Sequence, residues 1–586
     1  MEKKEEGQGG KQRFTDDDIR YILSRHDKAK SDRATWESTW QNLADYIIPE
    51  RANILAGGTP GATRTEKIFD TTAIDDLELW AGGMDGLMTP STLDFFLLRM
   101  EDDNLNESPD VNIWLEDTTQ RMHRAIRASN FHMEVHECYL DAGSIGTTAL
   151  YIQEGKDTDV TFQARHVNEI TILESVDGFV DTLFREFELT ARQCKQQFGE
   201  NKLTEGMKDA LKKDNREGGD EDTFTIVHAI YPRSDDKREK DDEGQFKSNP
   251  ESLPFASVYI VTDGDGAGEI IDEGGYYEFP YAVPRTKKMT GEIYGRSPAW
   301  NALPDIKMVN AMCKTYLRAI QKMTDPPVEI PDEGYVLPLK LGPGGVNFRS
   351  SVGGILDTKI TPISTGSQPQ FADEEIEKRR EAIGKKFLRE VWQVPIQPNM
   401  TAAEYLDRTR QLLRIVGPSV GRFQPELLKP IVIRVFGILY RAGKLLDPPM
   451  VIQQSGKIHV VFVSPISDAQ QAYEAETMNK ATMMIGPIAQ LDPTVLDNFD
   501  RDGMARTYWK DLRAPTSLLI PFNTVVKLRK ERADKAAADQ AKQELLAATE
   551  GIKNLKGTGV MDSLTAQTAA QTGNKTLGGA PGATIQ

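Results

Sequence analysis

Cysteine is scarce in this sequence. Its 586 residues include three cysteines, Cys138, Cys194 and Cys313, which are widely separated and odd in number. A secreted domain stabilised by disulfides carries many cysteines at short, even spacings. The sequence therefore excludes a disulfide framework and suits a reducing compartment.

Long hydrophobic runs are also missing. The most apolar stretch spans 14 residues, from Leu427 to Tyr440, and is interrupted by Lys429, Pro430 and Arg434. A membrane helix needs about 20 consecutive, mainly apolar residues. The first residues, MEKKEEGQGGKQRF, have no apolar centre of the kind found in signal peptides. We expect no membrane contact and a product of the cytoplasm.

An excess of cations is the third absence. Lys and Arg total 71 against 89 Asp and Glu, which gives a formal net charge of −18. Affinity for nucleic acid comes mainly from cations that neutralise phosphates. This balance argues against a tight, sequence-reading DNA binder but leaves room for local basic stripes. The length is ample for more than one buried core.

Catalytic signatures are lacking as well. The sequence has no G-x-x-x-x-G-K-[ST] phosphate loop and no G-x-S-x-G nucleophile turn. His132 and His136 lie one helical turn apart, a spacing that can bind zinc, with Glu137 or Cys138 as a further ligand. The Glu does not directly follow the first His, as it does in zinc hydrolases. We predict no enzyme, no metal and no cofactor, and a metal-dependent hydrolase at these histidines remains an alternative.

The first half of the chain predicts a mixed α/β region. Residues 1–13 are polar and indicate a disordered tail, after which Thr15 is placed to cap a helix that reaches Pro49. Further helices are expected at 73–88 and 110–145. Short β-rich runs follow, and these are Ala149–Gln153, Phe179–Leu189, Phe224–Tyr231 and Ala256–Val261.

The middle of the chain predicts two long helices around a small insert. Residues 298–324 carry an apolar stripe at helical spacing, and Asp373 to Trp392 carry a second one. Strand-like pieces, Val328–Ile330 and Tyr335–Leu341, lie in the 325–372 segment between them. This pattern indicates a helical stalk with a β-rich domain at its tip. The apolar stripe of the first helix consists of Val309, Met312, Cys313, Tyr316, Ile320 and Met323.

Four cations follow another face of the first long helix, and these are Lys307, Lys314, Arg318 and Lys322. Such a row is ordinary for the solvated face of an amphipathic helix. It could also be a sparse cationic track past which a polyanion moves. Four cations in one chain would give weak contact unless many copies face one axis.

The last third of the chain is predicted to be mainly helical. A loop at 393–400 precedes the capping box Thr401-Ala402-Ala403-Glu404, and the helix that it opens must kink or break at Pro418, Pro425 and Pro430. A strand at 457–463 and helices to about residue 546 follow. Residues 547–586 are rich in Gly, Ala and Thr, which predicts a disordered tail.

Several local phrases, in this order, resemble the head-to-tail connector (portal) proteins of short-tailed bacteriophages. The phrases are Trp36-Glu37-x-x-Trp40, Tyr46-x-x-Pro49-x-Arg51, Ile68-Phe69-Asp70-Thr71-Thr72, Ala81-Gly82-Gly83-Met84-x-Gly86-Leu87-Met88-Thr89-Pro90, Ser129-Asn130-Phe131, Gly143-x-x-Gly146-Thr147, Gly291-Glu292-x-Tyr294-Gly295-Arg296-Ser297-Pro298, Asp325-Pro326-Pro327, Thr401-Ala402-x-Glu404 and Leu427-Leu428-x-Pro430. One departure is Phe95-Phe96, where the family is expected to have Trp-Phe.

The resemblance implies a helix-rich mixed α+β portal fold assembled as a ring of usually twelve subunits. An α/β wing would cover 14–296, with its kinked helix and closing strands at 401–469. The stem would consist of 297–324 and 373–392, with the clip at 325–372 between them. The channel loop would be 393–400 and the helical crown 470–546. The tails at 1–13 and 547–586 lie outside these parts.

The resemblance also implies a function. The ring would stand at one vertex of the capsid, as a virion component assembled in the host cytoplasm, and double-stranded DNA would pass through it during packaging and ejection. Its partners would be other copies of the chain, a separate terminase motor, the capsid and scaffolding proteins, and tail adaptor proteins. Because a conduit must let DNA slide, we expect transient phosphate contacts from Lys307, Lys314, Arg318 and Lys322 and from polar Gln393, Gln397 and Asn399.

Ring closure would need one face of each subunit to meet a different face of the next. The clip strands and the stem stripes are the candidates for that surface. An oligomeric adaptor that never contacts DNA is the remaining alternative.

Overall fold

The computed structural model describes most of the chain, and it divides the chain into two compact units, Met1–Leu512 and Arg513–Gln586. In the part of the chain that the structure describes, the fold is mixed, with many helices and four sheets. The described residues are 14–51, 54–55, 65–102, 105–212, 221–241, 245–263, 268–332, 344–350, 361–362, 369–393, 415–418, 421–455, 457–463, 477–488, 498–511, 519–520 and 522–556, with single positions at 340, 342, 490, 492 and 494.

The first helix, α1 (Asp16–Ile47), begins as predicted. The Thr15 side chain accepts a hydrogen bond from the Asp18 backbone N–H, and the Asp18 carboxylate accepts one from the Thr15 backbone N–H. These two bonds form a capping box, with Asp in the place of the usual Glu or Gln. The apolar stripe of α1 buries Trp40 and Leu43 in the main core of the unit.

Two helices replace the single helix predicted at 110–145. After α2 (Thr72–Met88) come α3 (Pro109–Ala128) and α4 (Phe131–Ser144). The chain is extended at Ser129, and the Asn130 side chain exchanges two hydrogen bonds with the backbone of Phe162. These long-range hydrogen bonds hold the chain in a turn between α3 and α4, although the helical spacing of apolar residues continues through it. The prediction of one helix was therefore wrong.

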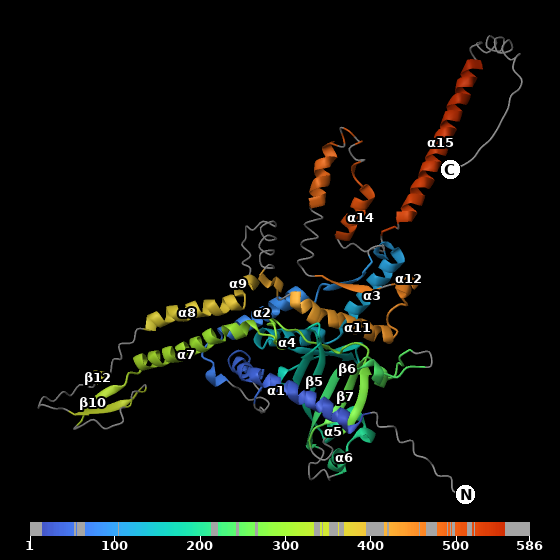
Figure 1. The fold of residues 1–586 in the computed structure, drawn as a ribbon. Helices are drawn as coiled ribbons and strands as arrows, with labels where there is room; N and C mark the ends of the chain where they lie inside the picture. The colour runs from blue at the N-terminus through green and yellow to red at the C-terminus, as the bar shows by residue number, and fades with distance from the viewer. Residues whose placement is uncertain are drawn as a thin grey trace, which may run out of the picture. The chain divides into compact units, whose positions relative to one another are not determined.

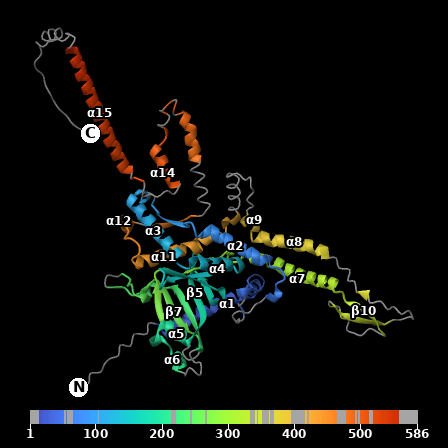
Figure 2. The same ribbon diagram turned by 180° about the vertical axis from the view of Figure 1, so that it is seen from behind.

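The predicted strands are confirmed in antiparallel sheets (Figures 1 and 2). The largest sheet has the order β4-β5-β6-β7-β8, a second has the order β3-β2-β9, and β1 pairs with β13. Helices α5 (Ala191–Phe198) and α6 (Glu205–Lys212) enclose a smaller apolar cluster against the large sheet. The strands are β1 (Phe96–Met100), β2 (Ala149–Glu154), β3 (Val160–Arg165), β4 (Ile170–Glu174), β5 (Val180–Thr190), β6 (Thr223–Pro232), β7 (Phe255–Val261), β8 (Ile270–Tyr276), β9 (Tyr281–Ala282) and β13 (Ile458–Phe462).

The first long helix of the middle region, α7 (Pro298–Thr324), has the predicted bounds. Ser297 caps it by accepting a hydrogen bond from the Trp300 backbone N–H at 2.9 Å. The second long helix is interrupted, as α8 (Pro369–Lys386) and α9 (Arg389–Trp392). Leu388 between them has φ 61°, the left-handed region that a leucine rarely adopts.

The interruption corrects the prediction of one helix over 373–392. Two side chains of α9 are held by α2: Arg389 donates to the Asp76 carboxylate at 2.6 Å, and a Cβ on Gly83 would overlap the Trp392 ring. These contacts turn the chain away from the axis of α8. The helical spacing of Val391 and Trp392 does not indicate this interruption of the helix.

A small three-stranded sheet lies in the segment between α7 and α8. Strand β10 (Val328–Asp332) pairs in parallel with β11 (Val346–Ser350) and antiparallel with β12 (Thr361–Pro362). The first strand confirms the prediction at 328–330. The strand predicted at Tyr335–Leu341 lies outside the described residues, apart from position 340.

The helix rich in proline is continuous from 421 to 441 in the described part. It contains one π-helical turn, Gln424–Leu428 (η9), directly before α11 (Lys429–Arg441). A π turn changes which backbone groups are paired. It can therefore accommodate prolines, which have no backbone N–H to donate. The distortion predicted at Pro425 and Pro430 is therefore present, whereas the capping box at 401–404 lies outside the described residues.

Further helices in the described part of the first unit are a short one over 415–418, α12 (Met450–Ser455), one over 477–488, and α14 (Arg501–Asp511). In the second unit α15 runs from Phe522 to Lys556, ten residues into the segment predicted to be a disordered tail. Gly551 is the one strong helix breaker among those residues, which explains why the helix continues. Within the described residues, no helix is long and apolar enough to span a bilayer.

Candidate functional site

Helices α7 and α8 lie side by side and antiparallel, and together they are called the arm here. The Asp305 carboxylate on α7 accepts hydrogen bonds from Arg379 at 3.1 Å and from Lys386 at 2.5 Å, both on α8. Lys386 also donates to the backbone carbonyl of Asn301 at 2.9 Å. The two cations lower the pKa of Asp305 below its ordinary value. The Asp305 carboxylate of α7, held between two cations of α8, thus links the two helices of the arm.

The apolar stripe predicted on α7 is buried only in its first half. Val309 and Cys313 are buried in the main core, and Met312 and Tyr316 pack against it. Further along the helix, Ile320 is 37% exposed and Met323 57% exposed. A helix inside a folded chain normally buries such a stripe. The outer half of α7 therefore presents apolar surface that the described part of this chain does not cover.

The four cations predicted on α7 differ in their surroundings. Lys307 donates to Asn42 Oδ1 of α1 at 2.7 Å, and the Nζ of Lys314 lies 5.1 Å from the centre of the Phe69 ring. Arg318 is exposed and Lys322 is half-buried. Neither has a hydrogen bond or an ion pair with any other described residue. Lys314, Arg318 and Lys322 are called the cationic edge below.

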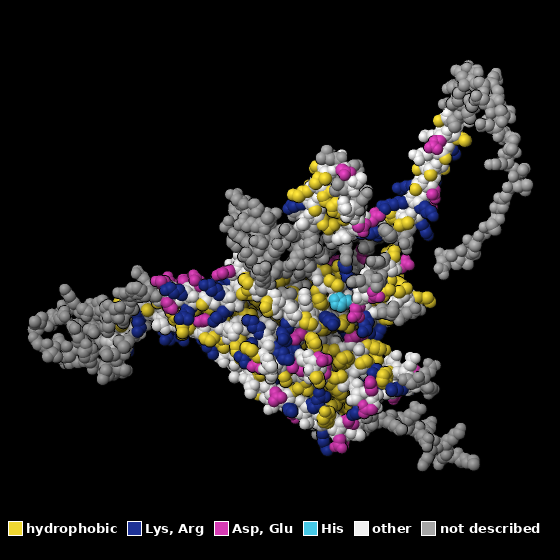
Figure 3. Space-filling model, turned by 45° about the horizontal axis from the view of Figure 1, so that its top comes forward, with side chains coloured by type: hydrophobic (Ala, Val, Ile, Leu, Met, Phe, Trp, Pro, Cys, Tyr) yellow, Lys and Arg dark blue, Asp and Glu magenta, His cyan; other side chains and the backbone are white. Residues whose placement is uncertain are grey.

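Two members of this edge point away from α8. At about 100° of rotation per residue, Lys314 lies about 180° around the helix from Asp305, which faces α8, and Arg318 lies about 140° from it. Lys322 follows one turn later at about 100° from Asp305. The α7 side of the arm carries Lys and Arg side chains in the space-filling view (Figure 3).

Helix α8 carries the opposite charge on its own free side. Glu374 and Glu377 are 70% and 57% exposed, and Glu381 is exposed one turn further on. Glu381 lies about 160° around α8 from Arg379, which faces α7. These three carboxylates form an acidic edge. Asp and Glu side chains gather along the α8 side of the arm (Figure 3). Sequence analysis missed this edge, although its spacing of three and four residues is a readable signal.

The base of α8 is fixed to α2 and to the segment before it by buried acids. Arg380 donates to the Asp70 carboxylate at 2.8 Å, and Arg389 binds Asp76 with both ends of its guanidinium. A cavity of about 610 Å³ adjoins these pairs and is also lined by Gln393. Gln393 is therefore exposed at the point where the predicted channel loop begins. Gln397 and Asn399 lie outside the described residues.

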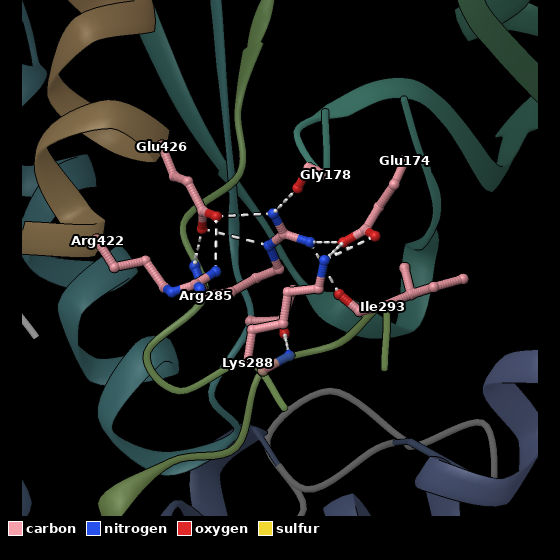
Figure 4. A network of polar contacts seen from close by, with 9 residues as sticks. Glu174, Gly178, Arg285, Lys288, Ile293, Arg422 and Glu426 are labelled. Carbon is pink, nitrogen blue, oxygen red and sulfur yellow. Dashed lines mark hydrogen bonds and ion pairs between the residues drawn. The ribbon is translucent and has the colours of Figure 1, made fainter. Parts of the chain in front are cut away.

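A second polar cluster joins segments that precede α7 and follow the loop (Figure 4). The Arg285 side chain is fully buried and donates twice to the Glu426 carboxylate, at 3.2 Å from Nε and 2.7 Å from Nη2. Its backbone N–H donates to the same carboxylate at 2.9 Å. The remaining donors of the guanidinium contact Glu174, Gly178 and Ile293. Arg285 thus connects the β4–β5 hairpin, the segment leading to α7 and the π turn.

Sequence reasoning did not find this cluster, because Arg285 and Glu426 are 141 residues apart. The phrase Leu427-Leu428-x-Pro430 directly follows Glu426 and was the only nearby signal. Its cations and carboxylates are paired with one another. We assign the cluster a positioning role, in which it holds these three segments together.

The two histidines of the hydrolase alternative lie on α4. Burial lowers the pKa of His132, and its Nδ1 has no hydrogen-bond partner among the described residues. His136 is half-buried one turn later. Within the described residues, no three His, Cys, Asp or Glu side chains form a group that could hold a metal ion. Among the described residues, the hydrolase alternative therefore has no third metal ligand beside His132 and His136.

Comparison with known proteins identifies similar chains. A family model described as bacteriophage head to tail connecting protein matches residues 20–519. The probable portal protein of Bordetella phage BPP-1 is 29% identical over 527 residues, which cover 89% of this chain and 92% of that protein. The portal protein of Salmonella phage epsilon15 is 27% identical over 550 residues, which cover 92% and 96%.

Proposed function

Because the chain belongs to the bacteriophage head-to-tail connecting proteins, the portal family, we propose that it assembles into a ring that serves as a conduit for double-stranded DNA. The observation that carries the proposal is the arm with its small sheet. A two-helix arm with exposed apolar and charged sides is incomplete in one chain, and many copies around an axis would complete it.

Parts of the chain are assigned on the same basis. The wing is 14–296 with 401–469, the stem is 297–324 with 373–392, and the clip is 325–372. The channel loop is 393–400 and the crown is 470–546. The clip would be the docking site for the terminase and the tail adaptor proteins, and the whole ring would stand at one capsid vertex beside capsid and scaffolding proteins.

Charge supports passage of DNA over capture. Each chain carries a formal charge of −18, whereas a strongly basic tunnel would retain DNA through counterion release. We propose that Lys314, Arg318 and Lys322 give the transient phosphate contacts of the stem, with Gln393, Gln397 and Asn399 from the loop. Lys307 is already bonded to Asn42, so its contribution would be smaller.

The ring itself is tested by imaging the purified protein. Class averages from electron microscopy should show closed rings with a central hole, of twelve subunits if this chain follows the number expected of the family. Particles that remain single copies under capsid-assembly conditions would contradict the proposal. Capsids assembled with this chain could also contain its ring and yet package no DNA. That result would favour the adaptor alternative.

The DNA contacts are tested by removing charge without reversing it. In the rings that still form, the triple variant Lys314→Gln, Arg318→Gln, Lys322→Gln should retain less packaged DNA, measured as nuclease-protected DNA per capsid. A matched control, Lys195→Gln, Lys208→Gln, Lys212→Gln, removes the same charge from α5 and α6. Equal retention in both variants would show that the cationic edge does not contact DNA.

A further inference from the structure

The arm has two free edges of opposite charge on opposite sides. The cationic edge of α7 consists of Lys314, Arg318 and Lys322, and the acidic edge of α8 consists of Glu374, Glu377 and Glu381. We propose that the cationic edge of one copy packs against the acidic edge of the next copy, so that neighbouring arms interlock around the ring. This inference rests on the ring of the proposed function and names its contact surface.

The charges on the cationic edge are available for another chain. Helix α7 contains a single acid, Asp305, and that acid is already held between Arg379 and Lys386 of α8. No hydrogen bond or ion pair joins Arg318 or Lys322 to a carboxylate of another described residue. A row of cations without such partners is a surface that an acidic partner fits.

The acidic edge keeps a net negative charge after its local pairs are considered. Glu374 is paired with Lys378, and Glu377 with Arg380, which in turn is bound to buried Asp70. Glu381 makes no hydrogen bond or ion pair with any other described residue. Exposed pairs within one helix are weak, so Glu374 remains free to exchange its partner.

The two edges overlap in height at Lys314 and Glu374. Lys314 is nine residues beyond Asp305, or about 13.5 Å further out along α7. Asp305 is level with the middle of the Arg379–Lys386 segment, and nine residues outward from there on antiparallel α8 lie Asp373 and Glu374. A copy placed beside this one at the same height would bring Glu374 opposite Lys314, and a tilt of the arms would carry the match to Arg318.

One exposed apolar side chain lies beside this edge. Leu317 is 47% exposed and lies one turn beyond Lys314. A neighbouring α8 would cover Leu317, whereas Met323 lies on the line of Asp305, which faces α8 of the same chain. The combination of apolar area and opposite charge is what separates this surface from an ordinary solvated helix face.

The charge arrangement selects a ring over a symmetric dimer. In a two-fold dimer each edge would meet its own copy, which would place cations against cations or acids against acids. When the two different edges meet, every copy uses one edge on each side, and the contact repeats until the ring closes. The cations would then lie at the seams between arms, where a carboxylate limits how strongly they bind phosphate.

Charge reversal tests the contact. The variant Lys314→Glu, Arg318→Glu would place acids against acids, and the variant Glu374→Lys, Glu377→Lys would place cations against cations. Each should lower the fraction of chains in rings by about tenfold or more, measured by sedimentation velocity and electron microscopy at low salt. The variant with all four changes should recover rings, because the edges are again complementary.

The control is Lys195→Glu, Lys212→Glu, which makes the same change of charge on α5 and α6 and should leave assembly unchanged. Rescue by the fourfold variant also excludes misfolding as the cause of a loss. If the wild type forms rings and both edge variants form them as well as the wild type does, the proposed contact is refuted while the proposed function stands. If the wild type forms no rings, the proposed function itself fails.

Discussion

Replacing Glu426 by Ala leaves the Arg285 guanidinium buried without its main counter-charge. In the wild type the cluster contains three cations, Arg285, Lys288 and Arg422, and two carboxylates, Glu174 and Glu426. The substitution leaves three cations around one carboxylate. It also removes the acceptor of three hydrogen bonds from Arg285.

The magnitude follows from burial. The Arg285 side chain is fully buried and that of Glu426 nearly so. Removing one partner of a buried ion pair destabilises a protein by about 3–5 kcal/mol. Glu174 still binds the guanidinium, so we expect a loss at the lower end, about 3 kcal/mol. The variant Glu426→Gln, which keeps an acceptor oxygen but loses the charge, should lie between Ala and the wild type.

The assay is urea unfolding of the unassembled chain at neutral pH, followed by tryptophan fluorescence. The control is Glu169→Ala, which removes the partly exposed partner of Arg185 and should cost no more than about 1 kcal/mol. If Glu426→Ala and Glu169→Ala lower the free energy of unfolding equally, the guanidinium does not depend on this carboxylate. The positioning role of the cluster would then be refuted.

Three further predictions concern stability. Gly146→Ala should destabilise by about 1–3 kcal/mol more than Gly199→Ala in urea titrations: both glycines have positive φ, but only at Gly146 would a Cβ meet backbone, at 2.5 Å. His228 is buried and its pKa is lowered to about 3 by desolvation, so the unfolded chain protonates first. Stability should fall as pH drops below about 6.5, with a slope from this group of at most about 1.4 kcal/mol per pH unit, and His228→Phe should remove that slope. The pKa of Asp18 is lowered to about 2, chiefly by its hydrogen bond with Lys237, so the small advantage of wild type over Asp18→Asn should be present at pH 7 and vanish between about pH 4 and pH 2 in thermal unfolding.

Local patterns in the sequence predicted many of the helices and strands of this protein. The N-cap at Thr15, the bounds of α7 and the strands of the large sheet follow from local chemistry, namely a hydroxyl before acids, an apolar stripe at helical spacing, and β-rich runs between turn residues. Family membership was also readable, because short phrases keep their order along the chain. These signals need only neighbours within a few residues, and that is why one chain sufficed to find them.

Tertiary structure decided where helices end and which charges face which. The corner at Asn130 depends on the backbone of Phe162, and the break at Leu388 depends on Asp76 and Gly83. The spacing of apolar residues does not reveal such contacts, because the same spacing is compatible with a helix that continues and with one that ends.

The same holds for the candidate site. The row of cations on α7 was visible in the sequence, but only the packing of α8 on Asp305 places that row on a free edge and an acidic row on the opposite one. Likewise, nothing local joins Arg285 to Glu426, because a buried charge takes whichever partner the fold brings to it. Local sequence patterns set the elements of this chain, whereas long-range contacts set which charged side chains remain on its surface.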